Sequence, residues 1–299
     1  MLVSIYMPTK NRLDMLKAAV ESVRNQTYEN FELIVVDEAS TDGTTEYLKH
    51  ISEVDSRVRF FRNEVSMGAC YARNLAIKAS SGVFVTGLDD DDEFKSNHIS
   101  ALVGYWNFLS QNSTDQIACI YCQYISRNGA RLKESQKLSN IEYTDLHRVN
   151  YIGNQIFAPR HHFIEAGLFD EQMPAWQDLE CFYRVLKKFG TARLLDMATY
   201  VFDTTPRTDR LSVGQKTRIS KACELMIKLH VPNDARAQQR LNLQVYSTYY
   251  GFAPTFKEVV DFVRRGFWFE GYLIIFLHYT HKSILRPLKK LIKKLLLIK

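Results

Sequence analysis

The strongest constraint on the fold is a regular alternation of apolar runs and helical patterns over the first hundred residues. Short apolar runs that are typical of buried strands occupy residues 3–7, 31–36, 58–61 and 83–88. Segments with helical spacing or helix-forming composition lie between them, at residues 13–23, 40–48 and 68–79. Apolar runs without strict polar alternation, separated by helices, indicate a mostly parallel sheet that is covered on both faces. We therefore expect an α/β fold.

The character of the chain changes near residue 205. Before that point the alternation continues with elements expected at residues 98–109 (helix), 117–125 (strand) and 178–189 (helix). Residues 126–139 are polar, contain the turn pair Asn128-Gly129, and are expected to form a mobile excursion. Residues 211–299 have helical patterns almost throughout, with breaks near Pro232, Pro254 and Gly266.

The 299 residues are therefore expected to form two parts. Residues 1–205 form the α/β domain, and residues 206–299 form a helical C-terminal region that ends in a basic amphipathic helix. The apolar fraction of 46% and the charged fraction of 24% are ordinary for a folded protein with a sizeable core.

The cysteines favour a reducing compartment over a disulfide framework, because they are odd in number and scattered along the chain. They are Cys70, Cys119, Cys122, Cys181 and Cys223. Cys119 and Cys122 form a C-x-x-C pair, which can be half of a metal site or two small apolar residues of a buried strand. No second Cys or His pair has metal-ligand spacing, so the structural interpretation is favoured.

The sequence predicts neither a secretory leader nor a membrane-spanning helix. Residues 1–7 are apolar but lack a basic start and end at Pro8, so they are interpreted as a first core strand. The longest later apolar run, residues 272–279, is too short to cross a bilayer.

The net charge of +6 comes from the C-terminal end. From Gly271 onward there is no acidic residue, whereas there are seven basic ones, namely Lys282, Arg286, Lys289, Lys290, Lys293, Lys294 and Lys299. An apolar stripe runs among them at helical spacing, formed by Ile284, Leu288, Leu291, Leu295 and Ile298. This pattern is typical of a helix that lies on an anionic membrane, although the stripe can also pack on preceding helices. We favour the membrane, because Leu296 and Leu297 widen the apolar face.

The sharpest local feature is the acidic run Asp89-Asp90-Asp91-Asp92-Glu93, which directly follows the strand pattern at 83–88. Adjacent carboxylates resist joint ionisation, and a divalent cation with oxygen ligands, Mg²⁺ or Mn²⁺, relieves that repulsion. Ligands in open α/β sheets bind beyond the carboxyl ends of strands, where this run lies. The alternative is a solvated acidic turn at a helix N-terminus.

Other polar groups are expected at the same edge of the sheet. Pro8, Thr9, Asn11 and Arg12 leave the first strand, and Asp37 ends the second. Asp37 can accept hydrogen bonds from a base or ribose, or it can shape a turn. Farther along, Gly68 permits close backbone approach, and Arg73 can bind a phosphate with its fork of donors or belong to a solvated helix face.

The ordered set of these motifs resembles the inverting family-two glycosyltransferases, which have the GT-A fold, a Rossmann-like sheet with helices on both faces. The resemblance rests on residues 4–12, on residues 34–44 (Ile-Val-Val-Asp-Glu-Ala-Ser-Thr-Asp-Gly-Thr), on Gly68 with Ala72-Arg73-Asn74, and on residues 88–92. It covers about residues 1–205 and implies a donor half at about 1–125 and an acceptor half at about 126–205.

The resemblance implies roles for individual residues. The nucleotide-binding set is Pro8, Thr9, Asn11, Arg12, Asp37, Arg73, Asp89 and Asp90. Asp89 and Asp91 match the two carboxylates of the family's DxD motif. Asp89 would lie near the ribose and the metal, and Asp91 would hold the cation on the diphosphate. Asp92 matches the additional acid that often follows.

The second half carries further family marks. Residues 165–171 are similar to the family's G-x-F-D-E stretch, and residues 176–184 to the segment that bears Glu-Asp. Here Gln177 replaces the Glu, and Asp178 matches the catalytic base, with Glu180 as a nearby competitor. Asp92, Trp176 and Gln177 are therefore placed on the acceptor or diphosphate side.

One departure concerns the end of this domain. The family often has a His before a Ser there, and residues 203–212 contain no His. Arg207 or Arg210 can contact the diphosphate instead, without binding a cation.

The resemblance implies transfer of a sugar from a nucleotide-diphosphate donor, with UDP favoured, to a hydroxyl of a lipid-linked saccharide. Bacterial surface polysaccharides such as O-antigen and lipopolysaccharide are made in this way. Mn²⁺ or Mg²⁺ is the implied cofactor, and Asp178 the implied general base. We expect a cytoplasmic protein that is peripheral on the inner membrane and binds no nucleic acid.

Two other classes of function compete. A sugar-1-phosphate nucleotidyltransferase should open with a glycine-rich phosphate loop, and residues 8–11 contain no glycine. A non-catalytic membrane-surface protein fits the basic tail but leaves the ordered polar motifs without a purpose.

Overall fold

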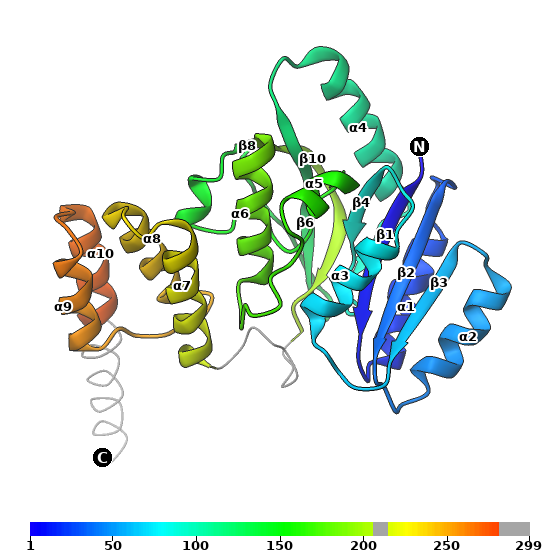
Figure 1. Cartoon of the computed structure of the whole chain (residues 1–299), viewed down its shortest axis with the longest axis horizontal. Coiled ribbons are helices and arrows are strands. Elements are labelled where there is room, and N and C mark those ends of the chain that lie inside the picture. Colours follow the sequence, from blue (N-terminus) through cyan, green and yellow to red (C-terminus); the bar gives the residue numbers. More distant parts are fainter. Residues whose placement is uncertain (206–214, 281–299) are drawn as a thin grey trace. The chain divides into compact units, whose positions relative to one another are not determined.

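The computed structural model describes residues 1–205 and 215–280, and the chain forms two compact units (Figure 1). The first unit contains Met1–Tyr143, Tyr151–Gln172 and the chain from Gln177 to the end of strand β10 (Thr191–Asp203). The second contains Thr144–Asn150, Met173–Trp176 and the helices from residue 216 onward. The two short stretches lie inside the α/β domain predicted from sequence, whereas by their contacts they belong to the helical unit.

The first sheet is the predicted parallel one, with strand order β3-β2-β1-β4-β9. Its strands are β1 (Val3–Thr9), β2 (Phe31–Glu38), β3 (Val58–Asn63), β4 (Phe84–Gly87) and β9 (Ala158–Pro159). Strands β1 to β4 pair in parallel, and β9 is antiparallel to β4. Every residue of β2 is buried, as expected for a strand with helices over both faces.

The face of the first sheet that each connecting helix covers follows from the chain order of the strands. These helices are α1 (Leu13–Arg24), α2 (Thr44–Val54) and α3 (Ala69–Ala79). Strand order reverses after β3, and right-handed crossovers then put α3 on the face opposite α1 and α2. Figure 1 shows α3 in front of β1 and β2, with α1 behind them. Leu16, Val20 and Val23 of α1 are fully buried, which confirms the predicted apolar spacing.

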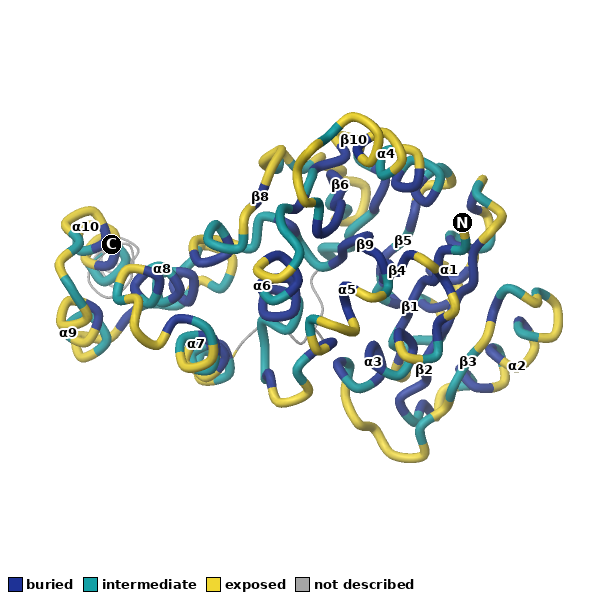
Figure 2. The backbone as a smooth tube through the Cα atoms, turned by 45° about the horizontal axis from the view of Figure 1, so that its top comes forward, coloured by how far each residue is buried: buried dark blue, intermediate teal, exposed yellow. Residues whose placement is uncertain are grey.

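The second sheet has the order β5-β10-β6-β7, with β8 (Asn140–Ile141) also paired to β10. Its other strands are β5 (Glu93–Phe94), β6 (Ile117–Asn128) and β7 (Arg131–Glu134). Helices α4 (His98–Asn112), α5 (Arg160–Glu165) and α6 (Gln177–Phe189) complete the unit. Ile120 and Phe157 exchange two backbone hydrogen bonds of 2.8 Å and so join β6 to the chain that enters β9. Buried backbone, dark blue in Figure 2, runs through both sheets.

The prediction of a mobile excursion at residues 126–139 is partly wrong. Strand β6 continues to Asn128 and returns as β7 in an antiparallel hairpin, with Gly129 at φ +56° in the turn. Polar strands can pair in this way because ladder hydrogen bonds come from the backbone and not from apolar side chains. Cys119 and Cys122 lie buried and unbridged in β6, in agreement with the structural interpretation.

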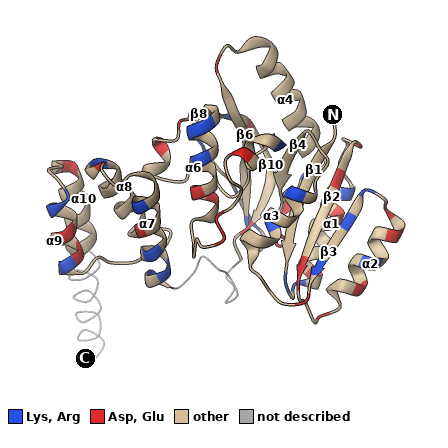
Figure 3. Ribbon diagram, viewed as in Figure 1, with Lys and Arg blue, Asp and Glu red and all other residues tan. Residues whose placement is uncertain are grey.

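The second unit contains the helices α7 (Lys216–His230), α8 (Ala235–Val245), α9 (Phe256–Arg264) and α10 (Phe269–Thr280), with the short 3-10 helix η1 (Asp145–His147). The predicted breaks at Pro232, Pro254 and Gly266 all fall between helices. Gln244 of α8 donates to the carbonyls of Leu146 and His147, each at 2.8 Å, and so holds η1 in the unit. Helix α10 carries one charged residue, Glu270, and is otherwise drawn in tan (Figure 3). Within residues 1–205 and 215–280, none of the helices combines the length and hydropathy needed to cross a bilayer.

Candidate active site

The parallel pairing brings the predicted polar strand ends to one edge of the first sheet. Thr9 is paired with Asp37 across β1 and β2, and Tyr6 with Gly87 across β1 and β4. A side chain at Gly87 would collide with the Tyr6 ring and Gln155 Oε1, at 2.2 and 2.1 Å. Glycine is therefore required where β4 delivers the acidic run to this edge.

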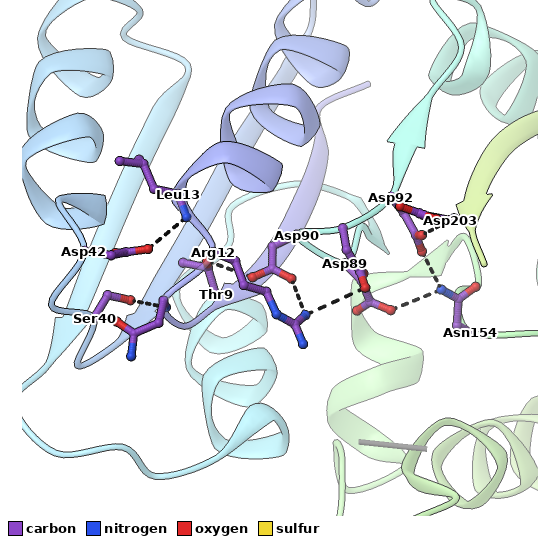
Figure 4. A network of polar contacts seen from close by, with 12 residues as sticks. Thr9, Arg12, Leu13, Ser40, Asp42, Asp89, Asp90, Asp92, Asn154 and Asp203 are labelled. Atoms are coloured by element: carbon purple, nitrogen blue, oxygen red, sulfur yellow. Dashed lines mark hydrogen bonds and ion pairs between the residues drawn. The ribbon is translucent and has the colours of Figure 1, made fainter. Parts of the chain in front are cut away.

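Asp90 is buried and bonded to the end of β1. Thr9 Oγ1 donates to Asp90 Oδ2 at 2.8 Å, and Arg12 Nη1 lies 2.9 Å from Asp90 Oδ1 (Figure 4). Burial raises the pKa of Asp90 to about 6, and Arg12 and Thr9 oppose that rise. These three residues, predicted to bind nucleotide, bind one another in this structure.

Arg73 joins Asp89 to Asp178. Its Nη2 lies 3.0 Å from Asp89 Oδ1 and its Nη1 lies 3.4 Å from Asp178 Oδ1, while its side chain is 8% exposed. The guanidinium also lies 5.3 Å from the centre of the Phe169 ring. Burial alone lowers the pKa of Arg73, but the two carboxylates outweigh it and raise that pKa, so the guanidinium stays charged. Arg73 is not a residue of a solvated face, and its predicted contact with a phosphate stays a prediction. Arg73 is an internal counter-ion.

Asp92 is held by a separate set of donors. Tyr200 donates its hydroxyl at 2.6 Å, the backbone N–H of Asp203 donates at 2.9 Å, and Asn154 Nδ2 donates at 3.1 Å. Asn154 Nδ2 also donates to Asp89 Oδ2 at 3.1 Å, so one amide bridges two carboxylates of the run. Burial, with Asp89 and Asp91 nearby, raises the pKa of Asp92.

Groups of the chain offset part of the repulsion within the acidic run. Arg12 and Arg73 supply positive charge, and hydroxyl and amide groups donate hydrogen bonds. Burial and neighbouring carboxylates still raise the pKa values of Asp90 and Asp92, so the predicted relief by a divalent cation stays a prediction. The carboxylates that keep exposure are Asp89 and Asp91, whose side chains are 23% and 17% exposed, against 5% for Asp90. Asp91 Oδ2 is 3.7 Å from Arg12 Nη1.

These two accessible carboxylates fit a hard divalent cation. Mg²⁺ and Mn²⁺ are commonly held by one or two carboxylates, with substrate phosphates and water filling the other positions. Among the described residues, no group of three or more His, Cys, Asp or Glu side chains is arranged to hold a metal. The predicted binding of a cation by Asp89 and Asp91 therefore stays a prediction that would need ligands from the substrate as well.

Asp37 is closed to solvent. Its carboxylate accepts from the Ser40 N–H at 2.9 Å, the Thr45 hydroxyl at 2.6 Å and Arg62 Nη1 at 3.0 Å. A base could bond to it only if one of these donors moved, so the predicted base contact stays a prediction. Arg62 has no feature in the sequence that marks it as a partner of Asp37.

The loop after β1 is fixed by strained backbone and by local hydrogen bonds. Asn11 has φ +52° and accepts from the Thr41 N–H at 2.8 Å, while its own N–H donates to Ser40 Oγ at 2.8 Å. Pro8 lies half-buried at the end of β1. Asn tolerates the left-handed region well, which explains its place at this turn.

Asp178 lies in the first turn of α6, where the helix dipole favours a carboxylate. Its Oδ1 is shielded and accepts no hydrogen bond from the described residues, whereas the side chain as a whole is 26% exposed. Burial raises the pKa of Asp178 to about 6, with Asp89 acting in the same direction and Arg73 against it. A carboxylate with few hydrogen bonds and a raised pKa has the properties of a general base.

Glu180, the competing base, is occupied elsewhere. Its side chain is 2% exposed, and its two oxygens accept from Arg184 Nε at 2.7 Å and Nη2 at 2.6 Å. A buried, doubly bonded carboxylate cannot take a proton from an incoming hydroxyl without breaking this pair.

Of the two residues before Asp178, Gln177 belongs to the first unit and Trp176 to the second. Gln177 Oε1 accepts from Arg73 Nη1 at 3.5 Å. Trp176 has φ +58°, and its indole N–H donates to the Tyr250 hydroxyl at 2.9 Å within the second unit. Left-handed backbone at a Trp is costly and clusters at functional sites. Arg207 and Arg210 lie outside the described residues.

Asn74, part of the motif Ala72-Arg73-Asn74, links α3 to the Gly-Leu-Phe-Asp-Glu stretch. Its amide donates to the Phe169 carbonyl at 2.8 Å and to Glu171 Oε1 at 2.9 Å, and it accepts from the Phe169 N–H at 2.8 Å. Neither this link nor the contacts of Asn154 and Tyr200 could be predicted from the sequence, because the partners are distant along the chain.

Comparison with known proteins identifies the family of the chain. The profile described as Glycosyl transferase family 2 matches residues 4–171. The putative colanic acid biosynthesis glycosyl transferase WcaA of Escherichia coli K12 is 34% identical over 203 residues, covering 67% of this chain and 71% of that protein. The UDP-Glc:alpha-D-GlcNAc-diphosphoundecaprenol beta-1,3-glucosyltransferase WfgD of Escherichia coli is 38% identical over 124 residues, covering 38% of this chain and 48% of that protein.

A solved structure shows the same fold. The crystal structure of S. aureus TarS 1-349 in complex with UDP-GlcNAc superposes with a TM-score of 0.65 at 17% identity, covering 89% of this chain and 79% of that one. The order of the motifs, the GT-A architecture and the profile match lead to one conclusion. The chain is an enzyme of glycosyltransferase family 2.

Proposed function

We propose that the protein transfers a sugar, with inversion, from a nucleotide-diphosphate donor to a hydroxyl of a lipid-linked saccharide. The observation that carries this proposal is the connection of Asp89 to Asp178 through the buried guanidinium of Arg73, with Asp91 two residues after Asp89 in the same acidic run. Donor chemistry and proton removal need groups that lie this close together.

Asp89 and Asp91 would hold Mg²⁺ or Mn²⁺ on the diphosphate. The cation supplies Lewis-acid stabilisation of the negative charge on the leaving diphosphate. Thr9, Arg12 and Asp90 would shape the nucleotide side, and Asp92, fixed by Tyr200 and Asn154, would keep the run in place. Arg207 or Arg210 stays a candidate for diphosphate contact.

Asp178 would act as the base. The acceptor hydroxyl gives its proton to the Asp178 carboxylate while its oxygen bonds to the anomeric carbon. The bond from that carbon to the diphosphate oxygen breaks on the opposite side, and the nucleoside diphosphate leaves with the electron pair. An α-linked donor then gives a β-linked product, because one displacement inverts the centre.

The relatives support the substrate classes. The printed name of WfgD specifies UDP-Glc and a diphosphoundecaprenol-linked acceptor, and TarS was crystallised with UDP-GlcNAc. By analogy we propose a UDP-sugar donor and a polyprenol-linked saccharide acceptor in bacterial polysaccharide synthesis. Such an acceptor places the enzyme at the cytoplasmic face of the inner membrane. The predicted basic helix at residues 282–299, which lies outside the described residues, would bind anionic lipid there.

The decisive test is a thermal-shift screen of nucleotide-sugars with and without Mn²⁺, followed by product analysis with the best donor. A true donor stabilises the folded enzyme by mass action, and its effect should grow with Mn²⁺. Asp91→Ala should lose the Mn²⁺-dependent part, whereas the exposed control Asp261→Ala should keep it. Equal shifts in both variants, or no sugar transfer from any donor, would count against the proposal.

A further inference from the structure

Helix α10 has apolar side chains on two opposite faces. Gly271 and Ile275 are buried, and the helix lies against α8 and α9 of the same unit. The other face carries exposed apolar side chains at the spacing of one helical stripe, namely Phe269, Leu273, Phe276 and Leu277. Their exposed fractions are 69%, 52%, 56% and 55%. Phe267, 80% exposed, directly precedes the helix.

We call these five side chains the apolar face of α10. A helix on the surface of a soluble domain is normally polar on its outer side, and contiguous exposed apolar patches mark interaction sites. Glu270 is the one charged residue of this helix. Among the described residues of the second unit, no element covers the face, and Figure 2 colours part of α10 as exposed.

The sequence that follows α10 identifies the kind of partner. Residues 281–299 lie outside the described part of the chain, but they contain seven Lys and Arg residues and no Asp or Glu. Apolar residues recur among them at steps of three or four residues, at Ile284, Leu288, Leu291, Leu295 and Ile298.

An anionic lipid bilayer accounts both for the exposed apolar face of α10 and for the basic residues that follow it. Its acyl boundary accepts Phe and Leu side chains, and its headgroups attract the neighbouring cations. An apolar protein surface would not account for the basic excess, and a nucleic acid would not account for four exposed Phe and Leu side chains on one helical stripe.

We propose that the apolar face of α10 inserts into the interface of an anionic membrane. This inference deepens the proposed action on a lipid-linked acceptor and rests on it. It assigns the insertion to described residues before Thr280, whereas the basic residues after them supply electrostatic attraction.

The test is sedimentation of the full chain with vesicles of phosphatidylglycerol and phosphatidylethanolamine, and with vesicles of phosphatidylcholine alone. The double variant Phe276→Glu with Leu277→Glu places two charges on the face. The control Phe108→Glu changes a side chain of equal exposure, 57%, on α4 of the first unit. We expect binding to the anionic vesicles to fall at least about tenfold in the double variant and to stay near wild type in the control.

Equal binding by the double variant and wild type would overturn the proposal, as would failure of wild type to bind anionic vesicles. Light scattering without lipid measures the oligomeric state of wild type and of the double variant. If wild type forms dimers that the double variant does not, a second copy covers the face and the proposal is wrong. A failed membrane result leaves sugar transfer by wild type intact, whereas absence of transfer from any donor refutes the proposed function itself.

Discussion

The acidic run of the first unit and the apolar face of α10 in the second depart from ordinary side-chain distribution in opposite directions. The run puts carboxylates inside, and Arg12, Arg73, Asn154 and Tyr200 compensate for their burial. The face of α10 puts Phe and Leu outside, and no described element of the second unit covers them. The comparison teaches that the first unit supplies counter-charges and donors for most of its buried carboxylates, whereas the second unit offers nothing comparable for its exposed apolar side chains.

The largest expected effect is at Asp178. Replacing it by Asn keeps the shape but removes the proton acceptor, so kcat should fall about 10³-fold. The affinity for the donor, measured by calorimetry, should change little. Near-normal turnover would remove Asp178 from the mechanism. The acidic run would then no longer be linked to catalysis in the contrast with α10.

Arg73 tests whether the buried carboxylates depend on their internal counter-ion. Arg73→Met leaves Asp89 and Asp178 facing each other without it, so the free energy of unfolding should fall by about 3 kcal/mol in urea denaturation. Arg59→Met removes a guanidinium that is 44% exposed and should cost no more than about 1 kcal/mol. Similar losses in both variants would contradict the special role of Arg73.

Substitution of Asp91 tests whether the accessible carboxylates of the acidic run hold a cation. Asp91→Ala should lower kcat/KM for the donor about 100-fold at fixed Mn²⁺, because one of the two exposed carboxylates is lost. Excess EDTA should abolish wild-type activity, and added Mn²⁺ should restore it. Full activity in EDTA would refute the metal assignment.

The raised pKa of Asp178 predicts an acid limb in the pH profile. The base must be ionised, so kcat/KM should fall about tenfold per pH unit below about 6. The same carboxyl holds its proton more tightly when folded than when unfolded, so its contribution to the free energy of unfolding decreases as pH rises from about 4 to about 6. An activity profile flat down to pH 5 would contradict the assignment.

The smallest effect is expected on α10. Phe276→Glu should change the free energy of unfolding by no more than about 0.5 kcal/mol in urea denaturation without lipid, because the side chain already faces water. A loss of several kcal/mol would mean that the face packs within the protein, and the contrast with the acidic run would disappear.

The sequence by itself was sufficient for the parallel sheet, because the buried strands β1, β2 and β4 are mostly apolar, lack strict polar alternation and lie between helical patterns. It also located the polar strand ends at one edge, since parallel strands place their carboxyl ends together. Ordered motifs identified the family. All of these signals are local, or repeat at a fixed spacing along the chain.

Only the tertiary structure decided which charges are paired. Arg73 lies 16 residues from Asp89 and 105 from Asp178, and Asn154 lies 62 from Asp92, so no local pattern joins them. The structure likewise buried Asp37 and Glu180 behind arginines that the motifs did not mark. Burial and pairing depend on which distant segments meet, and that depends on the packing of the whole unit.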